Sequence, residues 1–472
     1  MWASDRRRAA SGRILVTFAV VLAGCAPGGP YIGPDFAFGP SYRAARSGAP
    51  VLLNNTEWWR QLQDPVLDQL VGLALRDNLT LEGARERVTE ARASLQGIPG
   101  LATLAPSVGL RGAGTDDSGT GSTGPNGTGE ARLGLSWMLD PYGARREQIK
   151  AAGARIEVAD AEADAAQLLV LFNITDAYVE LRFRQRVAHL LRQELQSRRQ
   201  TLNITEDLLA ADSATRLDVI RSQARVAEIQ SQLPGAEAAI TATQNEIAVL
   251  AGAAPGTLPV DLAAGTAQPR PHLTPDVGIP ADLLRNRPDI RIAERSYYAA
   301  VADLGVAQAS LYPTLSLTGA ITLNALEGGR NSAAYFFGPT LQFPVFPGNA
   351  ARAAVDARRA RVLQAHTAWK TTVLNAILEV ENALLDYQAV TASLQSASRA
   401  AELYREARDL TRELFGAGAA TLGELIDAEQ ALAAADQALA NAVFRRGQSY
   451  VALNVRLGSG AAVAGIPAQS GN

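Results

Sequence analysis

The chain has 472 residues, with 44 lysines and arginines against 47 aspartates and glutamates. This near balance of charge lacks the basic excess that is typical of nucleic-acid-binding proteins. Apolar residues make up 47% of the chain, but after residue 25 no run approaches the ~18 apolar residues of a membrane helix, so membrane contact of the mature protein must use another kind of structure.

The first 24 residues have the pattern of a signal peptide. Arginines at 6–8 and 13 form a positive region, Ile14–Ala23 is apolar, and small residues precede Cys25, the single cysteine of the chain. The pattern resembles a bacterial lipobox, in which the cysteine becomes the lipidated first residue after cleavage. A diacylglycerol with an N-acyl chain would anchor the N-terminal segment 25–64 stably. The alternative is a signal peptide that ends by chance beside a buried thiol.

Residues 65–252 are predicted to begin with a helix followed by two strands. Apolar residues at helical spacing, such as Leu67 and Leu70, predict an amphipathic helix from Pro65 to about Leu95. Alternation of apolar with small or polar residues around Val108–Leu110 and Leu133–Leu139 predicts two strands joined by a loop. The loop residues 119–124 match a GxGxxG pattern, but they lie between strands and lack a following Lys-Ser or Lys-Thr, so we interpret them as a hairpin loop and not a phosphate cradle.

A very long helical region is predicted from Arg145 to Leu250. Short and polar residues at Ala210–Thr215 interrupt its periodicity, which predicts a helical hairpin with its tip there. We expect arms of about 60 residues, each ~90 Å long at 1.5 Å per residue. Such arms are too long for a compact globule and are typical of a tube or a coiled-coil bundle.

The second half of the chain repeats the first. After a proline-rich linker at 253–280, the segment Leu135–Gly252 aligns without a gap on Leu341–Gly458, a shift of 206 residues. The shift is 207 at the first strand (Pro106 on Pro313) and 209 in the helix before it (Leu81 on Ile290). A period this long indicates a duplicated multi-element unit with internal pseudosymmetry.

The second copy, residues 281–458, is therefore predicted to contain the same elements. These are a helix at 281–308, strands at Thr314–Asn324 and Tyr335–Val345, and a helical hairpin at Arg352–Leu457 broken at Gly416–Thr421. We expect a flexible tail at 459–472. The predicted fold is mainly helical, with four strands in each chain.

The strands favour a membrane barrel built from several copies of the chain. Their length of about ten residues crosses a bilayer. The alternation alone would ordinarily favour strands half-buried on a soluble core, but the export signal, the lipid anchor and the strand length favour the membrane. Four strands cannot close a barrel, and an open edge in lipid leaves backbone groups unsatisfied at several kcal/mol each. Three copies would supply twelve strands and leave a passage, whereas the eight strands of two copies would be filled by side chains. The predicted lipid-facing row is Leu133, Leu135, Trp137, Leu315, Leu317, Ile321, Leu323, Phe337, Leu341 and Phe343.

Several motifs resemble the outer-membrane efflux proteins (TolC/OprM-like), and in particular their lipoprotein branch, the NodT family. Cys25 followed by Gly33–Phe36 and Pro40, and Trp58–Pro65 with Asn78-Leu79, resemble the mature start of that branch. Residues 279–295 and 305–313 resemble the most distinctive stretch of the family. The resemblance covers residues 25 to about 458. It implies a homotrimer with a twelve-stranded outer-membrane barrel and a periplasmic helical barrel, an exit duct that works with a periplasmic adaptor (membrane fusion) protein and an inner-membrane pump of the resistance-nodulation-division class.

The resemblance also implies a periplasmic constriction near the hairpin tips. Gly423–Ala428 resembles the acidic constriction segment of the family, so Asp427 is a candidate gate residue with Glu424 beside it. The repeat aligns Arg221 with Asp427, and we expect these charges of neighbouring hairpins to pair; an ordinary solvated acid is the alternative. The residues expected at the tips, where an adaptor would dock, are Asp212, Ser213, Ala214, Thr215, Gly416, Gly418 and Thr421. Asp212 occupies the place of a glycine that the family usually has.

Two other classes of function fit parts of the sequence. An enzyme is disfavoured because the histidines, His189, His272 and His366, are scattered and there is no cysteine pair for a metal. No cofactor is expected apart from the covalent lipid. A lipid-anchored periplasmic coiled-coil scaffold without a pore would explain the helices and the lipid, but not the four alternating strands.

Overall fold

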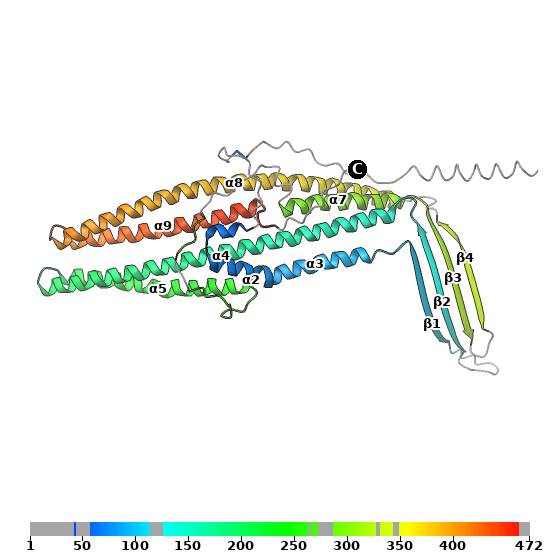
Figure 1. Ribbon diagram of the computed structural model, residues 1–472, viewed down its shortest axis with the longest axis horizontal. Coiled ribbons are helices and arrows are strands. Elements are labelled where there is room, and N and C mark those ends of the chain that lie inside the picture. The colour runs from blue at the N-terminus through cyan, green and yellow to red at the C-terminus, as the bar shows by residue number, and fades with distance from the viewer. Residues whose placement is uncertain are drawn as a thin grey trace, which may run out of the picture. The chain divides into compact units, whose positions relative to one another are not determined.

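The computed structural model describes residues 42–43, 57–113, 126–263, 267–271, 287–326, 331–342 and 349–461. Cys25, Phe343 and the predicted tail beyond residue 461 lie outside the described residues. The chain divides into two compact units (Figure 1). The first unit comprises Met1–Asp35, Val88–Ala159 and Ile292–Lys370, and the second Phe36–Arg87, Asp160–Arg291 and Thr371–Asn472.

Helices make up most of the described chain, and the strands come in two pairs. In chain order the elements are η1 (Trp58–Leu62), α2 (Pro65–Asp77), α3 (Leu79–Gln96), β1 (Ala102–Ala113), β2 (Asn126–Leu139), α4 (Ala144–Ala210), α5 (Arg216–Leu250), α7 (Pro288–Ala309), β3 (Thr314–Leu326), β4 (Ser332–Gln342), α8 (Asn349–Gly416) and α9 (Leu422–Arg456). Within the described residues, no helix combines the length and apolar character needed to cross a membrane.

The predicted helical hairpins are present, but their arms are unequal. The first arms, α4 and α8, have 67 and 68 residues, whereas the second arms, α5 and α9, have 35 each. The prediction of about 60 residues was therefore wrong for the second arms. They end early because Gly252 and Gly458 follow them with φ of 76° and 77°, a left-handed conformation that closes a helix end. At Gly252 no side chain would fit, since a Cβ built there would lie 2.2 Å from the Asp77 carbonyl oxygen.

The predicted helix at 65–95 is two helices, α2 and α3, because Asn78 lies between them in extended conformation. Its side-chain Oδ1 accepts hydrogen bonds from the amides of Thr80 and Leu81 at 2.9 and 3.1 Å, which caps the start of α3. Its Nδ2 donates to the Leu250 carbonyl at 2.8 Å, which satisfies the end of α5. Asn78 thus joins the end of one helix to the start of another.

The second copy makes the same joint with a different side chain. Arg287 is the residue aligned with Asn78, and its Nη1 donates to the carbonyl of Arg456, the residue aligned with Leu250, at 2.9 Å. The Arg287 guanidinium also pairs with Asp289 at 2.6 Å and Glu379 at 2.9 Å. The pseudosymmetry therefore extends from the sequence to individual hydrogen bonds.

In the first unit, the four strands form one antiparallel sheet in the order β1-β2-β3-β4. The two predicted hairpins join because β2 pairs with β3 from Thr128 opposite Leu326 to Leu139 opposite Leu315. The strands have 12, 14, 13 and 11 residues, slightly longer than predicted. Across the described part of the chain, β1 pairs only with β2 and β4 only with β3.

The buried core of the second unit includes an aromatic pair from the start of the described chain, Trp58 and Trp59. Trp58 is fully buried and meets Trp59 and Tyr450 edge-on, with ring centroids 6.1 and 6.2 Å away. Asp64 accepts a hydrogen bond from the Tyr178 hydroxyl at 2.5 Å, and Arg182 donates to the same hydroxyl at 2.8 Å. The Trp58–Pro65 motif thus ties the N-terminal segment to helices of both copies.

Candidate functional site

The sheet has one almost entirely apolar face. Residues directly opposite each other in an antiparallel pair project to the same side, so the register places Leu133, Ile321 and Tyr335 in one row across three strands. Every described member of the predicted lipid-facing row lies on this face. The row is Leu133, Leu135, Trp137, Leu315, Leu317, Ile321, Leu323, Phe337 and Leu341.

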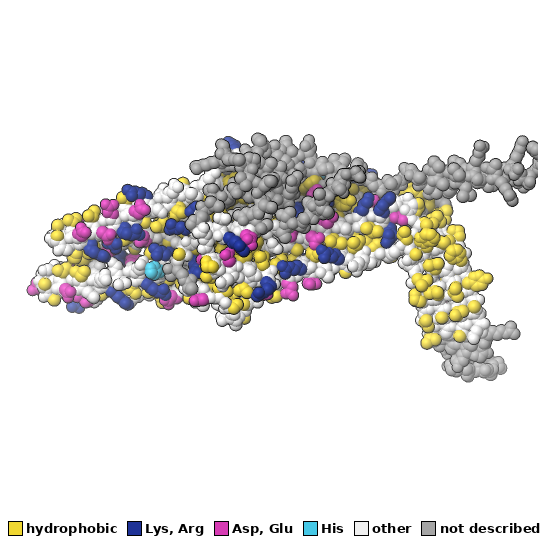
Figure 2. All heavy atoms as spheres, in the orientation of Figure 1, with side chains coloured by type: hydrophobic (Ala, Val, Ile, Leu, Met, Phe, Trp, Pro, Cys, Tyr) yellow, Lys and Arg dark blue, Asp and Glu magenta, His cyan; other side chains and the backbone are white. Residues whose placement is uncertain are grey.

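These apolar side chains are open to the surroundings of the chain. Ile321 is 52%, Phe337 67% and Tyr335 86% exposed, and Figure 2 shows hydrophobic side chains spread over the strands. A contiguous apolar surface of this extent marks contact with a membrane or with another protein.

The opposite face of the sheet is mainly polar. It carries Ser136, Thr318, Thr322 and Asn324, with Arg132 on β2. Thr318 and Thr340 face each other across β3 and β4 with their hydroxyl oxygens 3.0 Å apart. Among the described side chains of this face, Met138 and Phe336 are the large apolar exceptions. The sheet therefore has one apolar and one mainly polar face, as expected where one face meets lipid and the other meets water.

The two hairpin tips have the same backbone design. The Ser213 amide donates to the Leu208 carbonyl at 2.8 Å and the Ala419 amide to that of Leu414 at 2.8 Å, and each bond closes the end of a first arm. The residue just before each of these amides has a left-handed backbone conformation, with φ of 53° at Asp212 and 72° at Gly418. The structure thus places Asp212 in a conformation that favours glycine, the residue that the second copy has at this place.

Each second arm starts with a capping box. Thr215 caps α5 together with Asp218, and Thr421 caps α9 together with Glu424. Hydrogen bonds from Thr421 lower the pKa of Glu424, and those from Thr215 lower the pKa of Asp218. The candidate gate residue Glu424 is therefore engaged in building the tip.

The other two candidate gate residues are exposed, one on each hairpin. Asp427 lies on α9 and Arg221 on α5, each in the second turn after the tip. Among the described residues of one chain no ion pair joins them. Arg221 instead lies close enough to Asp218 to help lower the pKa of that carboxyl. Pairing of Asp427 with Arg221 between neighbouring hairpins stays a prediction.

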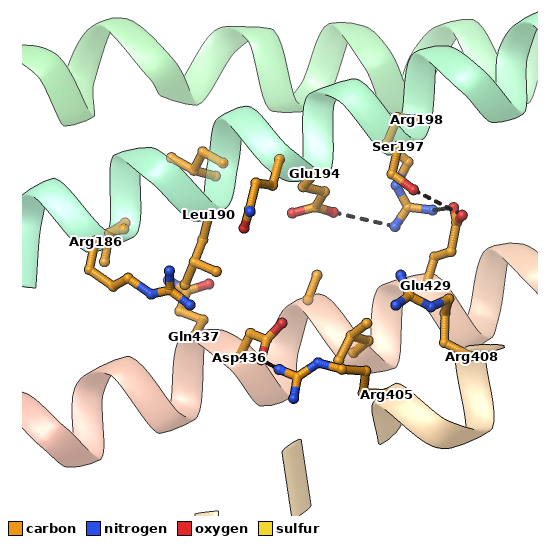
Figure 3. A pocket seen from close by; sticks show the side chains of 15 residues that line it. Arg186, Leu190, Glu194, Ser197, Arg198, Arg405, Arg408, Glu429, Asp436 and Gln437 are labelled. Atoms are coloured by element: carbon orange, nitrogen blue, oxygen red, sulfur yellow. Dashed lines mark hydrogen bonds and ion pairs between the residues drawn. The ribbon is translucent and has the colours of Figure 1, made fainter. Parts of the chain in front are cut away.

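Sequence reasoning missed a buried acid close to the tips, Glu429 on α9 (Figure 3). Its carboxylate accepts hydrogen bonds from Ser197 at 2.9 Å, Thr201 at 3.2 Å and Arg412 at 3.0 Å. Arg198 lies 3.6 Å away, and the side chains of this pair are each only 5% exposed. The sequence carried a signal for it, because Glu429 interrupts the apolar series Leu425 and Leu432 on one face of the helix.

Glu429 links three helices, α4, α8 and α9, and lies at the edge of a cavity of about 390 Å³. Charged side chains line this cavity, including Arg186, Arg408 and an ion pair of Arg405 with Asp436 at 2.8 Å (Figure 3). Among the described residues no cluster of histidine, cysteine or acidic side chains could hold a metal. Its charged lining makes the cavity a polar gap between the two helical hairpins.

A one-sided apolar sheet combined with two long helical hairpins defines the class of outer-membrane channels that carry a helical duct. Comparison with known proteins agrees. The model of the family described as outer membrane efflux protein matches residues 70–253 and 279–459. Nodulation protein T of Rhizobium leguminosarum bv. trifolii is 32% identical over 451 residues, which cover 94% of this chain and 96% of that protein. The pyoverdine export outer membrane protein OpmQ of Pseudomonas aeruginosa is 29% identical over 94% of this chain and 96% of its own length.

The fold agrees with solved channels as well. The structure of the outer-membrane channel OprN superposes with a TM-score of 0.82 at 30% sequence identity, covering 92% of this chain and 99% of that one. The chain therefore belongs to the outer membrane efflux protein family. Members of this family are transport channels, and the protein is an outer-membrane exit duct of a tripartite efflux system with a periplasmic extension.

Proposed function

We propose that three copies of this chain form a lipid-anchored trimer that conducts small molecules out of the periplasm. In this assembly the sheets close a twelve-stranded barrel in the outer membrane, and the helical hairpins form the periplasmic duct. A periplasmic adaptor protein docks at the hairpin tips, and an inner-membrane pump of the resistance-nodulation-division class drives the transport. The covalent lipid at Cys25 is the only added group.

The sheet is the observation that carries this proposal. Its edge strands β1 and β4 have no further partner within the described chain, while one face is apolar and open. In lipid, unpaired edges cost several kcal/mol for each backbone group, and pairing of β4 in one copy with β1 in the next removes that cost. Twelve strands leave an open passage, whereas eight do not.

Native mass measurement in detergent tests the assembly. The purified mature protein should have three times the mass of one chain, and the trimer should dissociate on a gel only after heating. A monomeric mass for protein that retains its helical content would contradict the trimer and favour a scaffold.

Metabolic labelling with palmitate tests the lipid anchor. The wild-type protein should incorporate the label, and Cys25→Ser should lose it, because the thioether bond needs the thiol. Loss of transport in this variant is expected to be partial, since the sheet still inserts. Labelled lipid on the Ser variant would show that the anchor lies elsewhere.

A further inference from the structure

Four arginines line the cavity beside Glu429, and they come from both helical hairpins. Arg186 and Arg198 lie on α4, and Arg405 and Arg408 lie on α8. Three acids share the lining, namely Glu194, Glu429 and Asp436. All of these residues belong to the second unit of one chain. The cavity is therefore built within a single copy, and its wall has more basic than acidic side chains.

Glu429 is fully paired. It forms a buried ionic cluster with Arg198 and Arg412, at 3.6 and 3.0 Å. Ser197 and Thr201 donate hydrogen bonds to its two carboxylate oxygens as well. Both oxygens of Glu429 are therefore occupied, and two of their donors, Arg412 and Thr201, reach it from outside the cavity lining.

The other two acids of the wall each hold one arginine. Asp436 pairs with Arg405 at 2.8 Å, and Glu194 accepts a hydrogen bond from Arg198 at 3.3 Å. A guanidinium has five N–H donors, and each of these two contacts uses a single arginine nitrogen. The Arg405 guanidinium therefore keeps most of its donors without an acceptor among the described residues.

Arg408 and Arg186 have even fewer acceptors. Arg408 donates through Nε to Asp409, its neighbour on the same helix, at 2.6 Å, and its two terminal nitrogens have no acceptor within the described chain. Arg186 forms neither a hydrogen bond nor an ion pair with any described residue. Figure 3 shows Arg186 at one end of the cavity and Arg408 at the other. Unused guanidinium donors thus line the cavity at both ends.

A ligand that complements this wall must accept hydrogen bonds and carry negative charge. Arg186 is half-buried, and the Arg408 side chain is only 21% exposed, so water screens their charges incompletely. Without a counter-charge, the guanidinium groups of α4 and α8 repel each other across the cavity. Phosphate and carboxylate oxygens match a guanidinium in both geometry and charge. A cation or a neutral donor would leave the same N–H groups unsatisfied.

The dimensions of the cavity favour an anion with more than one charged group. Its volume of about 390 Å³ lies within the ~300–1,000 Å³ of small-molecule sites. Between Arg186 and Arg198 the wall follows α4 for more than three turns, or ~18 Å at 1.5 Å per residue. A monovalent ion would contact one end only, whereas an elongated anion can reach arginines at both ends.

We propose that this cavity binds a polyvalent oxyanion, with several phosphate or carboxylate groups, and that the bound anion joins the two hairpins of one chain. One end of the anion accepts hydrogen bonds from Arg186 on α4, and the other end accepts them from Arg408 on α8. The buried ionic cluster of Glu429 already holds α4 to α8 and α9, and the anion extends this joint away from the tips. The site involves one copy of the chain, so it is independent of the trimer.

Calorimetric titration of pyrophosphate into the full-length protein tests the site. In a neutral detergent at constant ionic strength, we expect saturable binding of one pyrophosphate to each chain. Arg186→Gln and Arg408→Gln should each weaken binding by roughly tenfold to a hundredfold, the effect of losing one charge-assisted hydrogen bond. A parallel titration with citrate shows whether the site prefers phosphate or carboxylate oxygens.

Arg199→Gln is the matched control. Arg199 follows Arg198 on α4, but it is exposed and does not line the cavity. Its affinity for pyrophosphate should stay within about twofold of the wild type, because an exposed charge outside the cavity is largely screened by salt. Arg186→Lys keeps the charge but loses the planar fork of donors, so it should bind more tightly than Arg186→Gln and more weakly than the wild type. Circular dichroism and native mass check that each variant keeps its fold.

Hydrogen exchange measures whether the anion joins the hairpins. Pyrophosphate should slow amide exchange around residue 186 on α4 and around residue 408 on α8 together, because the bound form opens less often than the free protein. Each Gln variant should lose this protection on both helices. Protection of one helix alone would overturn the bridge between the hairpins.

Binding of pyrophosphate or citrate that Arg186→Gln and Arg408→Gln weaken, and that Arg199→Gln does not, is the result we expect. Two results would overturn the site. If neither anion binds, water satisfies the arginines; if all three Gln variants lose the same affinity, the anions gather on the surface by charge alone. Either result leaves the exit duct standing, since the duct does not depend on this cavity.

Discussion

At the residue scale, position 212 shows how one side chain can differ between two otherwise equal tips. Asp212 and Gly418 hold the same left-handed place at the end of a first arm. Glycine adopts this conformation without a steric penalty, whereas other L-residues pay for it, with aspartate among the more tolerant. The first tip is therefore expected to open locally more often than the second.

Asp212→Gly should stabilise the first tip by about 0.5–1 kcal/mol, and Gly418→Ala should destabilise the second by about 1–2 kcal/mol. Hydrogen exchange of the amides that close the arms, Ser213 and Ala419, measures both effects. Exchange at Ser213 should slow by roughly twofold to fivefold in the first variant, and exchange at Ala419 should quicken in the second. If neither rate changes, the left-handed conformation carries no cost at these tips.

Asp427 and Arg221 provide a second test at this scale, since both are exposed and lie on different hairpins. Partly exposed pairs contribute only ~0–1 kcal/mol each, so three of them between neighbouring hairpins would bias an aperture without locking it. Asp427→Ala and Arg221→Ala should each raise single-channel conductance and the uptake of large antibiotics. The double variant should be no leakier than either single one, because one interaction is lost in all three.

Glu413→Ala, which removes an exposed acid from the other arm of the second hairpin, is the control for the gate variants. It should leave conductance unchanged. Unchanged conductance in both Asp427→Ala and Arg221→Ala would reduce the pair to ordinary surface charge.

At the element scale, the two faces of β3 should respond differently to the same substitution. Leu317→Arg places a charge on the apolar face and should cost ~2–4 kcal/mol if the side chain reaches the bilayer midplane. Thr318→Arg, one residue along, projects from the polar face and should be tolerated. The yield of heat-labile trimer in outer-membrane fractions measures both variants. Equal tolerance at the two positions would contradict the assignment of lipid to the apolar face.

The sequence allowed these elements to be predicted because their patterns are local. Strict alternation in Thr314–Asn324 places successive side chains on opposite faces whatever the surroundings, and the short polar residues at Ala210–Thr215 interrupt the helical periodicity at the tip itself. The break at Asn78 was not predicted, because it depends on a contact that is distant in the sequence. The Asn78 side chain caps the start of α3 and also bonds to the Leu250 carbonyl at the end of α5, 172 positions away. Glu429 was missed for the same reason: its partners come from α4 and α8, which only the fold brings together.

At the scale of the whole molecule, duplication explains why one chain contains two nearly equal halves that are not interchangeable. Asn78 and Arg287 make the same contact with the end of a second arm through different side chains. The acid at the centre of the buried ionic cluster, Glu429, belongs to the second copy only. The two copies thus share the backbone design but differ in their side chains. In a threefold assembly, this gives six similar helical hairpins.

Ion conductance across a planar lipid bilayer is the most direct test of whether this protein is a channel. We expect discrete current steps when the trimer is added to the bilayer, and larger steps from Asp427→Ala, whose aperture is less constrained. Both proteins are measured because a wild-type channel that rests closed would pass no current by itself, whereas the variant would. Folded, trimeric protein that inserts into the bilayer but passes no current in either form would contradict a channel and leave the chain as a scaffold.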